Sequence, residues 1–318
     1  MLSAEILERI RSGNSFWVAT HIDPDGDAIG SVLLVGRLLR HLGKKYAIYL
    51  CDPVPHKFEF LAGVEEITNK EPDFKPDTFI TVDLPDLVRL GYTPPQSQII
   101  NIDHHPSNED YGDYNWIDVN RTAACVMVLE LLKSVDFPLG RQEGEMVFTG
   151  IYTETGGFSY PNVSTEVFLV SADILELGVN AADIALRMTA RDERNLALLG
   201  KVLATLRIED TVATIELTEN MLKELEINRA DQDSDSFIRY PVSIPGVRIA
   251  IFFRENPTSG EVRMSFRSLT GVDVNQLAAR FGGGGHQNAA GARVRGDYKE
   301  VKKRVLEEAK GYLSCAEA

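Results

Sequence analysis

The feature that most constrains this chain is an acidic loop between a buried strand and a helix. Residues 16–20 (FWVAT) form a short apolar run of the kind found in buried strands. Residues 28–42 then repeat Ile, Leu and Val at helical spacing. The loop between them carries His21, Asp25 and Asp27. A strand that runs through a loop into a helix is typical of an α/β fold, in which ligands bind beyond the carboxyl ends of the strands.

The charges of this loop point to a cation. One imidazole and several carboxylates in so few residues repel one another and lose hydration unless a positive ion lies among them, and a divalent metal ion is the simplest choice. An ordinary turn followed by a helix N-cap explains the same residues, because Asp and Gly are common in both. The loop alone leaves both interpretations open.

Two more strands are predicted downstream, at residues 78–82 and 98–102. They end directly on side chains that bind metals, which are Asp83 after the first strand and Asp103, His104 and His105 after the second. Singly, such residues are often helix caps, turn residues or structural histidines. Because the carboxyl ends of parallel strands meet at one edge of a sheet, three strand ends of this kind favour one shared metal site.

Composition limits the class of protein and its partners. A chain of 318 residues has room for about two domains. A formal net charge of −14 argues against a protein that coats long duplex nucleic acid. From Glu261 onward, however, there are 10 basic and 7 acidic residues, against 23 and 40 before it. This asymmetry fits a metal site in the first part and a phosphate site in the last, or ordinary variation of the surface.

The chain lacks the sequence signals of membrane proteins and of disulfide-rich secreted proteins. No apolar run is long enough to span a bilayer, and residues 1–13 predict an amphipathic helix without the apolar core of a signal peptide. We therefore expect a cytoplasmic protein without membrane contacts. Cys51, Cys125 and Cys315 are far apart, which argues against a disulfide framework and a cysteine zinc site. The oligomeric state stays open.

The remaining periodicity predicts two domains joined by a helix. Helical spacing recurs at residues 121–132, 144–152, 165–177, 181–187 and 193–206. Glu154, after the second of these segments, is the last acidic candidate for the metal site, with a solvated helix-end glutamate as the alternative. We expect a mainly parallel sheet with flanking helices in residues 1–190, a helical linker in residues 191–206 and a smaller α/β domain in residues 207–318.

A predicted strand in the second domain carries a candidate phosphate site. In residues 261–267, alternation places Arg263, Ser265 and Arg267 on one face. Two guanidiniums that flank a hydroxyl suit a phosphate. A solvent-facing polar stripe on a half-buried strand gives the same pattern.

A run of four glycines, Gly282–Gly285, precedes His286 further along the chain. Consecutive glycines cost conformational entropy, so a close approach of the backbone to another group is expected here. Exposed N–H groups beside an imidazole suit an anion. A flexible hinge is one alternative, and close packing with the following Ala-Ala-Gly segment is another.

Together these segments resemble the DHH phosphoesterase family, in its nanoRNA-degrading oligoribonuclease (NrnA-type) branch, which is also described as acting on 3′-phosphoadenosine 5′-phosphate. The resemblance covers nearly the whole chain. It rests on motifs in the family's order, which are HIDPDGDAIGS, TVDLPD, IDHHPSN, GIYTETGGF, VRMSFRS and FGGGGHQNAAGA. It implies a DHH catalytic domain, a DHH-associated substrate-binding domain and two divalent metal ions in a cleft between them. Mn²⁺ is the expected ion, with Mg²⁺ or Co²⁺ as alternatives.

The resemblance also implies roles for single residues. The first metal ion would be held by His21 and Asp25 and the second by Asp27 and His104, with Asp83 bridging both. Asp103 would orient the imidazoles, and His105 would face the phosphate, so the implied catalytic residues are Asp83, Asp103 and His105. The substrate nucleotide would be held by Arg263, Ser265, Arg267, Gly284, Gly285 and His286. The family usually has Asp where Glu154 stands, so this ligand of the second metal would have a longer reach.

The implied activity is hydrolysis of short oligoribonucleotides to 5′-mononucleotides, and also of 3′-phosphoadenosine 5′-phosphate to AMP. The residues agree with it, because carboxylates and imidazoles suit manganese or magnesium better than structural zinc, and a two-metal site needs no nucleophilic side chain. Three alternatives stay open. They are a cyclic- or linear-dinucleotide phosphodiesterase, a manganese pyrophosphatase, and a non-catalytic nucleotide sensor in which Glu154 has abolished turnover.

Overall fold

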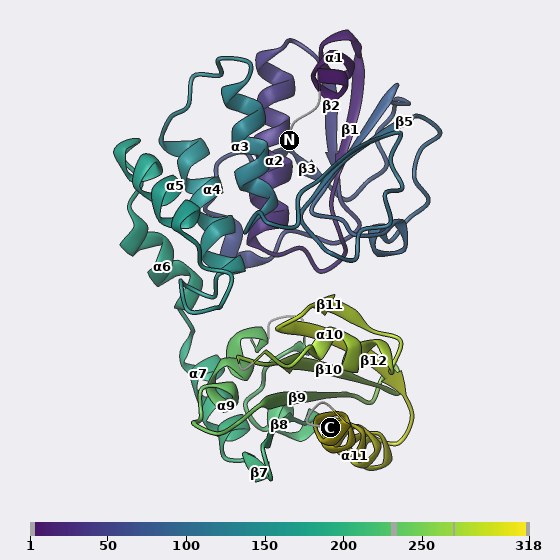
Figure 1. Ribbon diagram of the computed structural model, residues 1–318, viewed down its shortest axis with the longest axis vertical. Coiled ribbons are helices and arrows are strands. Elements are labelled where there is room, and N and C mark those ends of the chain that lie inside the picture. Colours follow the sequence, from purple (N-terminus) through teal and green to yellow (C-terminus); the bar gives the residue numbers. More distant parts are fainter. Residues whose placement is uncertain (1–3, 230–233, 270, 316–318) are drawn as a thin grey trace. The chain divides into compact units, whose positions relative to one another are not determined.

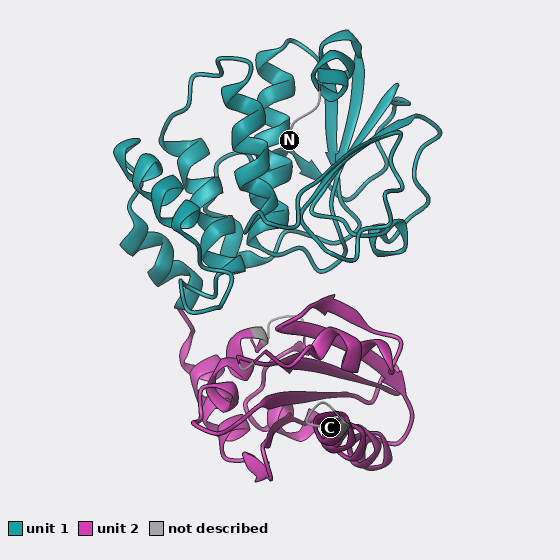
Figure 2. Cartoon of the chain, in the orientation of Figure 1, with its two compact units in different colours: residues 1–189 teal, residues 190–318 magenta. Residues whose placement is uncertain are grey.

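The computed structural model describes residues 4–229, 234–269 and 271–315, and the chain forms two compact units, residues 1–189 and 190–318 (Figure 2). Each unit contains one six-stranded sheet with helices packed against it. The expected α/β architecture, with a mainly parallel sheet first and a smaller sheet domain second, is therefore confirmed. Of the helices in the described ranges, none combines the length and the apolar character needed to cross a membrane.

The sheet of the first unit is parallel throughout, in the order β3-β2-β1-β4-β5-β6. Chain order reverses between the central strands β1 and β4, and in such sheets the ligand site lies beyond the carboxyl ends at this reversal point. The short edge strands β3 and β6 carry little apolar pattern and are absent from the sequence-based prediction. The strands are β1 Ser15–Ala19, β2 Lys45–Tyr49, β3 Ile67–Thr68, β4 Thr78–Val82, β5 Gln98–Asp103 and β6 Tyr114–Ile117.

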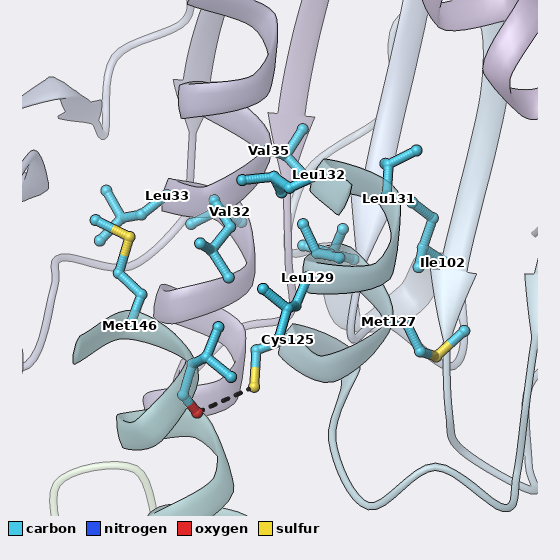
Figure 3. Packing of buried hydrophobic residues seen from close by; sticks show 14 of the residues in the cluster. Val32, Leu33, Val35, Ile102, Cys125, Met127, Leu129, Leu131, Leu132 and Met146 are labelled. Atoms are coloured by element: carbon cyan, nitrogen blue, oxygen red, sulfur yellow. Dashed lines mark hydrogen bonds between the residues drawn. The ribbon is translucent and has the colours of Figure 1, made fainter. Parts of the chain in front are cut away.

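Helices α2, α3 and α4 lie together beside one face of this sheet (Figure 1). Val35 of α2, Leu132 of α3 and Met146 of α4 belong to one buried apolar cluster (Figure 3). The opposite face is covered by a smaller cluster that includes Trp17 and Leu90. The helices of the unit are α1 Ala4–Ser12, α2 Gly26–His41, α3 Ala124–Lys133, α4 Arg141–Glu154, α5 Thr165–Glu176 and α6 Ala181–Thr189.

Glycines let α2 and α4 cross with almost no space between them. A Cβ atom at Gly30 would lie 2.7 Å from the carbonyl oxygen of Met146. One at Gly150 would lie 2.5 Å from Cys125 Sγ and 2.8 Å from Asp27 Oδ1. Any side chain at these positions would therefore push the two helices apart. The crossing fixes the distance between the start of α2 and the end of α4.

The sheet of the second unit has the order β11-β12-β10-β9-β8-β7 and is antiparallel except for the β8–β9 pair. One of its faces packs on α10 and α11, and the other, near β8 and β9, on α7. The strands are β7 Arg207–Glu209, β8 Val212–Leu217, β9 Ile249–Asn256, β10 Glu261–Arg267, β11 Gly284–His286 and β12 Ala289–Arg295. The helices are α7 Glu193–Leu203, α8 Glu219–Glu224, α9 Arg239–Val242, α10 Val274–Ala279 and α11 Tyr298–Cys315.

Two elements of this unit differ from the sequence-based expectation. The helix expected as a linker is α7, and its Leu198 and Val202 are buried in the core of the second unit, so it is part of that unit. The glycine run expected as a loop instead contributes β11, because Gly284–His286 pairs with β12. Apolar periodicity shows neither feature, since both depend on contacts with segments distant in sequence.

Candidate metal centre and phosphate-binding face

The strand ends at the reversal point bring the predicted metal ligands together. His21 lies two residues beyond β1, Asp83 directly follows β4, and β5 ends on Asp103. Because β1, β4 and β5 are parallel neighbours, their carboxyl ends share one edge of the sheet. Three groups of ligand atoms form there, each with all atoms within 4.8 Å of one another. The groups are His21–Asp25–Asp83, Asp27–Asp83–His104 and Asp83–Asp103–His105.

In the first group, His21 presents one ring nitrogen to the centre. Its Nδ1 lies 2.8 Å from the carbonyl oxygen of Ile22 and donates to it, so Nε2 faces Asp83 Oδ2 at 3.4 Å. Burial lowers the pKa of His21, but the interaction with the Asp83 carboxylate outweighs burial and leaves the pKa raised. A positive charge is therefore favoured at Nε2, whether it is a proton or a metal ion.

Asp25 is both a helix cap and a ligand candidate. Its Oδ1 accepts hydrogen bonds from the backbone N–H groups of Asp27 at 2.9 Å and Ala28 at 3.1 Å, in the first turn of α2. Among the described residues, none donates to Oδ2. The turn-and-cap interpretation of this loop and the metal interpretation are thus compatible, because each uses a different oxygen.

In the second group, Asp27 is fully buried and held at both oxygens. Its Oδ2 accepts from the backbone N–H of Ala124 at 2.6 Å and its Oδ1 from that of Cys125 at 2.8 Å. Asp27 therefore caps α3 from another helix, where the N-cap residue of α3 is an alanine. Burial and the charge of Asp83 raise the pKa of Asp27 to about 7, and the nearby His104 opposes this shift. A nearby cation would stabilise two adjacent buried carboxylates of this kind.

His104 completes the second group in the same way as His21 completes the first. Its Nδ1 lies 3.2 Å from the carbonyl oxygen of Arg121, and its Nε2 lies 3.3 Å from Asp83 Oδ1 and 3.7 Å from Asp27 Oδ2. Burial lowers the pKa of His104, but the carboxylates, Asp83 first among them, raise it well above the usual range. The backbone oxygen of Arg121 thus fixes the ring so that Nε2 points at the carboxylates.

Asp83 is shared by the two groups and has the geometry of a bridge. Its Oδ2 faces His21 and its Oδ1 faces His104. Within the described part of the chain, Oδ1 is buried and accepts no well-aligned hydrogen bond. The residue has a left-handed backbone, with φ 53°, and its N–H donates to the carbonyl oxygen of Ile102 at 3.0 Å. Aspartate is one of the few residue types that adopt this conformation at little cost.

Both carboxylate oxygens of Asp103 accept hydrogen bonds, so this residue supports neighbouring side chains of the centre. Its Oδ1 lies 2.8 Å from His105 Nδ1, and its Oδ2 accepts from Asn108 Nδ2 at 2.6 Å. The same Asn108 amide donates to the carbonyl oxygen of Leu84, and its Oδ1 accepts from Asn101 Nδ2 at 2.9 Å. Asp103 therefore orients the imidazole of His105, and the carbonyl oxygen of Arg121 holds the ring of His104.

Glu154 ends α4 beside the centre but lies outside the three groups of ligand atoms described above. Burial and the charge of Asp25 raise the pKa of Glu154 well above its usual range, against the lowering effect of His104. The carboxyl group of Glu154 therefore interacts electrostatically with the acidic residues of the centre. Its role as a ligand of the second metal ion stays a prediction.

The donor chemistry of the two groups fits a pair of divalent metal ions. Each group offers one imidazole nitrogen and carboxylate oxygens, and both groups share Asp83. This mixture of oxygen and imidazole without thiolate suits manganese or magnesium, and it does not choose between them. Both histidines donate their Nδ1 proton to a backbone carbonyl oxygen, an arrangement typical of metal-binding histidines.

The register of the second sheet gathers most of the predicted phosphate contacts on one face. Directly opposite residues of paired strands point to the same side. Three rows result, which are Arg254–Arg263–Arg293, Ser265–Gly291–Gly284 and Arg267–Ala289–His286, and the buried Phe252 and Ala250 of β9 continue the second and third rows. We call the nine residues of the three rows, without Phe252 and Ala250, the arginine face. Their neighbours in β10, such as Met264, point into the core. Phosphate binding on the arginine face stays a prediction.

The glycines beside this face serve the packing of β11 against β12. A Cβ atom at Gly283 would lie 2.1 Å from the carbonyl oxygen of Gly291, and one at Gly285 would lie 2.5 Å from that of Ala289. The close approach expected from the glycine run is therefore an approach to a neighbouring strand. Gly284 is exposed on the arginine face, whereas Gly285 lies in register with Ala290, a core residue.

Comparison with known proteins assigns this architecture to a family. The profile of the DHH family, N-terminal domain, matches residues 15–151, and that of the DHHA1 domain matches residues 220–314. A relative from Thermus thermophilus, named bifunctional oligoribonuclease and PAP phosphatase NrnA, is 34% identical over 99% of this chain and 94% of its own length. The chain belongs to the DHH family.

Two further proteins match over similar lengths at lower identity. A Bacillus subtilis protein of the same name is 23% identical over 92% of this chain and 93% of its own length. The solved structure of an exopolyphosphatase-related protein from Bacteroides fragilis is 24% identical, has a TM-score of 0.89 and covers 99% of this chain and 97% of that one. This last likeness shows a shared fold.

The three residues of the DHH motif have three different positions in the centre. Asp103 is hydrogen-bonded on both oxygens, His104 faces two carboxylates, and His105 is oriented by Asp103. Asn108 is absent from the sequence-based prediction, although it lies within the IDHHPSN motif. An asparagine just after a proline and a serine suggests a turn, and only the fold shows that its amide joins two strand ends.

Proposed function

We propose that this protein is a two-metal phosphoesterase that hydrolyses short oligoribonucleotides to 5′-mononucleotides, and 3′-phosphoadenosine 5′-phosphate to AMP. The observation that carries this proposal is the sharing of Asp83 between two buried groups of ligand atoms. Relatives over nearly the whole chain are named oligoribonuclease and PAP phosphatase, which supports the substrate class. Short RNA fragments arise where RNA is degraded, so the cytoplasm is the proposed location and Mn²⁺ the proposed ion.

The metal ligands would be His21, Asp25 and Asp83 for one ion and Asp27, Asp83 and His104 for the other, with Glu154 as a further ligand of the second. Two such ions, when bound, lower the pKa of a water molecule and polarise the phosphoryl oxygens. The carboxylates and imidazoles would hold both ions, with Asp83 shared. Attack by water would break the P–O3′ bond, and the O3′ leaving group would take up a proton. With RNA the phosphate would stay on the 5′ oxygen of the next nucleotide, and with the bisphosphate it would leave as inorganic phosphate.

His105 and the arginine face would position the substrate. Asp103 accepts a hydrogen bond from Nδ1 of His105 and so orients the ring, and Nε2 would be the atom that contacts the phosphoryl group. Arg263, Ser265, Arg267, Gly284, Gly285 and His286 would hold the phosphate at the other end of a short substrate.

Product analysis with a substrate panel tests this proposal. Metal-stripped protein is re-supplied with Mn²⁺ and offered an RNA dinucleotide, a 5-mer, a 24-mer, 3′-phosphoadenosine 5′-phosphate, cyclic di-AMP and pyrophosphate. We expect fastest release of mononucleotides from the shortest RNAs and of AMP from the bisphosphate. A preference for the cyclic dinucleotide or for pyrophosphate would replace the proposed substrate class. Tight nucleotide binding without turnover would favour a sensor and direct attention to Glu154.

A further inference from the structure

The arginine face contains a buried arginine, Arg254, that is absent from the sequence-based prediction. It contacts Ser265, one of the residues proposed to hold the substrate phosphate. Arg254 of β9 is only 5% exposed and lies directly opposite Arg263. Its Nη2 lies 2.6 Å from Ser265 Oγ, and its guanidinium carbon lies 5.0 Å from the centre of the Phe252 ring. The guanidinium is thus held in one place by a hydrogen bond and a stacked ring.

The polarity of this hydrogen bond fixes the role of the serine. Arginine has donors and no acceptor, so Ser265 Oγ must accept from Arg254. The hydroxyl hydrogen of Ser265 is then directed to a different partner, and no side chain or carbonyl group in the described ranges accepts it. A serine hydroxyl can donate or accept hydrogen bonds, but here it is left to donate to a further partner. The positive charge of Arg254 makes the hydroxyl a stronger donor.

The surroundings of Ser265 suit an anion. On one side its cross-strand neighbour is the buried Phe252 of β9. On the other side Gly291, and Gly284 beyond it, carry no side chains, which leaves the space on that side of the hydroxyl open. Arg263 and Arg267, two positions before and after it in β10, lie on the same face. A group that only accepts hydrogen bonds and carries negative charge matches this set of donors, and a phosphate has both properties.

We propose that Arg254 is a positioning residue that sets the Ser265 hydroxyl as a donor to the terminal phosphate of the substrate, the one that is not hydrolysed. The inference rests on the proposed function and deepens it, because it names the chemical group that the second unit selects. A terminal phosphate would be bound, and a terminal ribose hydroxyl, which brings a hydrogen of its own, would be bound more weakly.

Nucleotide binding without metal tests this role. In an Asp83→Asn background, stripped of metal, calorimetry compares AMP with adenosine, so that only the phosphate differs. We expect AMP to bind at least 10-fold more tightly. Ser265→Ala and Arg254→Met should each reduce AMP binding about 5- to 10-fold and leave adenosine binding unchanged. In the double variant the second change should add less than twofold, because one residue acts through the other.

Two further variants and one kinetic measurement separate positioning from folding. Arg254→Lys keeps the charge and one donor and should restore part of the AMP affinity. Lys303→Met on α11 removes the same charge from a helix packed on the other side of the sheet and should change nothing. In the active protein, Arg254→Met should raise KM and leave kcat within twofold.

Several results would overturn the inference. Effects of Arg254→Met and Ser265→Ala that multiply in the double variant would show independent action. An equal loss of adenosine binding would show a general structural role for Arg254. If AMP is not preferred over adenosine while the protein still hydrolyses short RNA, the phosphate assignment fails and the proposed hydrolase function stands.

Discussion

The metal centre of the first unit gathers negative charges and the arginine face of the second gathers positive charges. The two sites differ in how these charged groups are held in place. At the metal centre, Asp25, Asp27 and Asp103 each have a carboxylate oxygen within 4.8 Å of one of Asp83. Backbone N–H groups fix Asp25 and Asp27, and backbone carbonyl oxygens fix the imidazoles of His21 and His104. On the arginine face, guanidiniums from three strands line up with varied exposure. A buried, fixed site controls chemistry through distances, whereas an open charged face controls affinity. Substitutions should therefore change turnover and metal content in the first unit, and substrate binding in the second.

The largest expected effect is that of Asp83→Asn. Asparagine accepts the left-handed backbone of this residue but loses the charge that both ligand groups share. We expect kcat to fall about 10⁴-fold or more, which corresponds to roughly 5.5 kcal/mol, and bound metal per protein to fall below two. Atomic absorption and turnover of short RNA measure both. Asp136→Asn is the matched control, because Asp136 also has a left-handed backbone, with φ 52°, in an exposed turn. Near-normal turnover of Asp83→Asn would refute the two-metal mechanism.

A smaller loss is expected when the support of the centre is removed. Asn108→Leu deletes the amide that holds both Asp103 and the carbonyl oxygen after Asp83. Changes of this kind typically cost about 10- to 100-fold in activity or metal affinity. We expect a loss of this size in kcat, with KM little changed. Asn69→Leu removes a comparable amide that bridges two backbone carbonyls elsewhere, and it should leave kcat unchanged. Equal losses in both variants would indicate general destabilisation.

Arg267→Met tests the expected role of the second unit in substrate binding. The guanidinium lies on the arginine face, and its Nε is buried without a hydrogen bond from the described residues. Loss of one charge-assisted contact costs about 1.5–3 kcal/mol, so KM for short RNA should rise at least 10-fold while kcat stays within twofold. Arg280→Met, at the end of α10, should leave KM unchanged. An effect of Arg267→Met on kcat alone would contradict the division of tasks.

The smallest expected effect is a change with pH in the free energy of unfolding of the metal-free protein. The pKa of Asp27 is raised to about 7, so the folded state holds a proton that the unfolded state has already lost. This contribution to stability is present at low pH and is lost as pH rises through 7. From pH 6 to pH 8 the free energy of unfolding should fall by about 1–2 kcal/mol. Denaturant titrations at both pH values measure it. Added Mn²⁺ should abolish the fall, and a rise of stability with pH would contradict the assignment.

Much of the metal centre follows from the sequence because its ligands lie at strand ends. Apolar strands are recognisable, and parallel strands must bring His21, Asp83 and His104 to one edge. The supporting contacts do not follow in the same way. Asn108 and the backbone oxygen of Arg121 act through contacts between distant segments, and no local pattern separates them from ordinary turn residues.

The arginine face shows a second limit of sequence analysis. Alternation within one strand correctly places Arg263, Ser265 and Arg267 on one side, but it says nothing about which residues lie opposite. Arg254 and Arg293 join them only through the register of three strands. Glycine runs are ambiguous for the same reason, since Gly284 and Gly285 of the four-glycine run belong to the short strand β11, which pairs with β12.

The crossing of α2 and α4 restricts how descendants of this chain can change. At Gly30 the first atom that a new side chain meets is a main-chain oxygen, which cannot move aside by a change of rotamer. At Gly150 it meets a sulfur atom and a carboxylate oxygen of the centre itself. A different distance between Asp27 on α2 and Glu154 on α4 therefore requires the two helices to shift together. The arginine face is not subject to this restriction, so substitutions there are the simpler route to a new substrate preference.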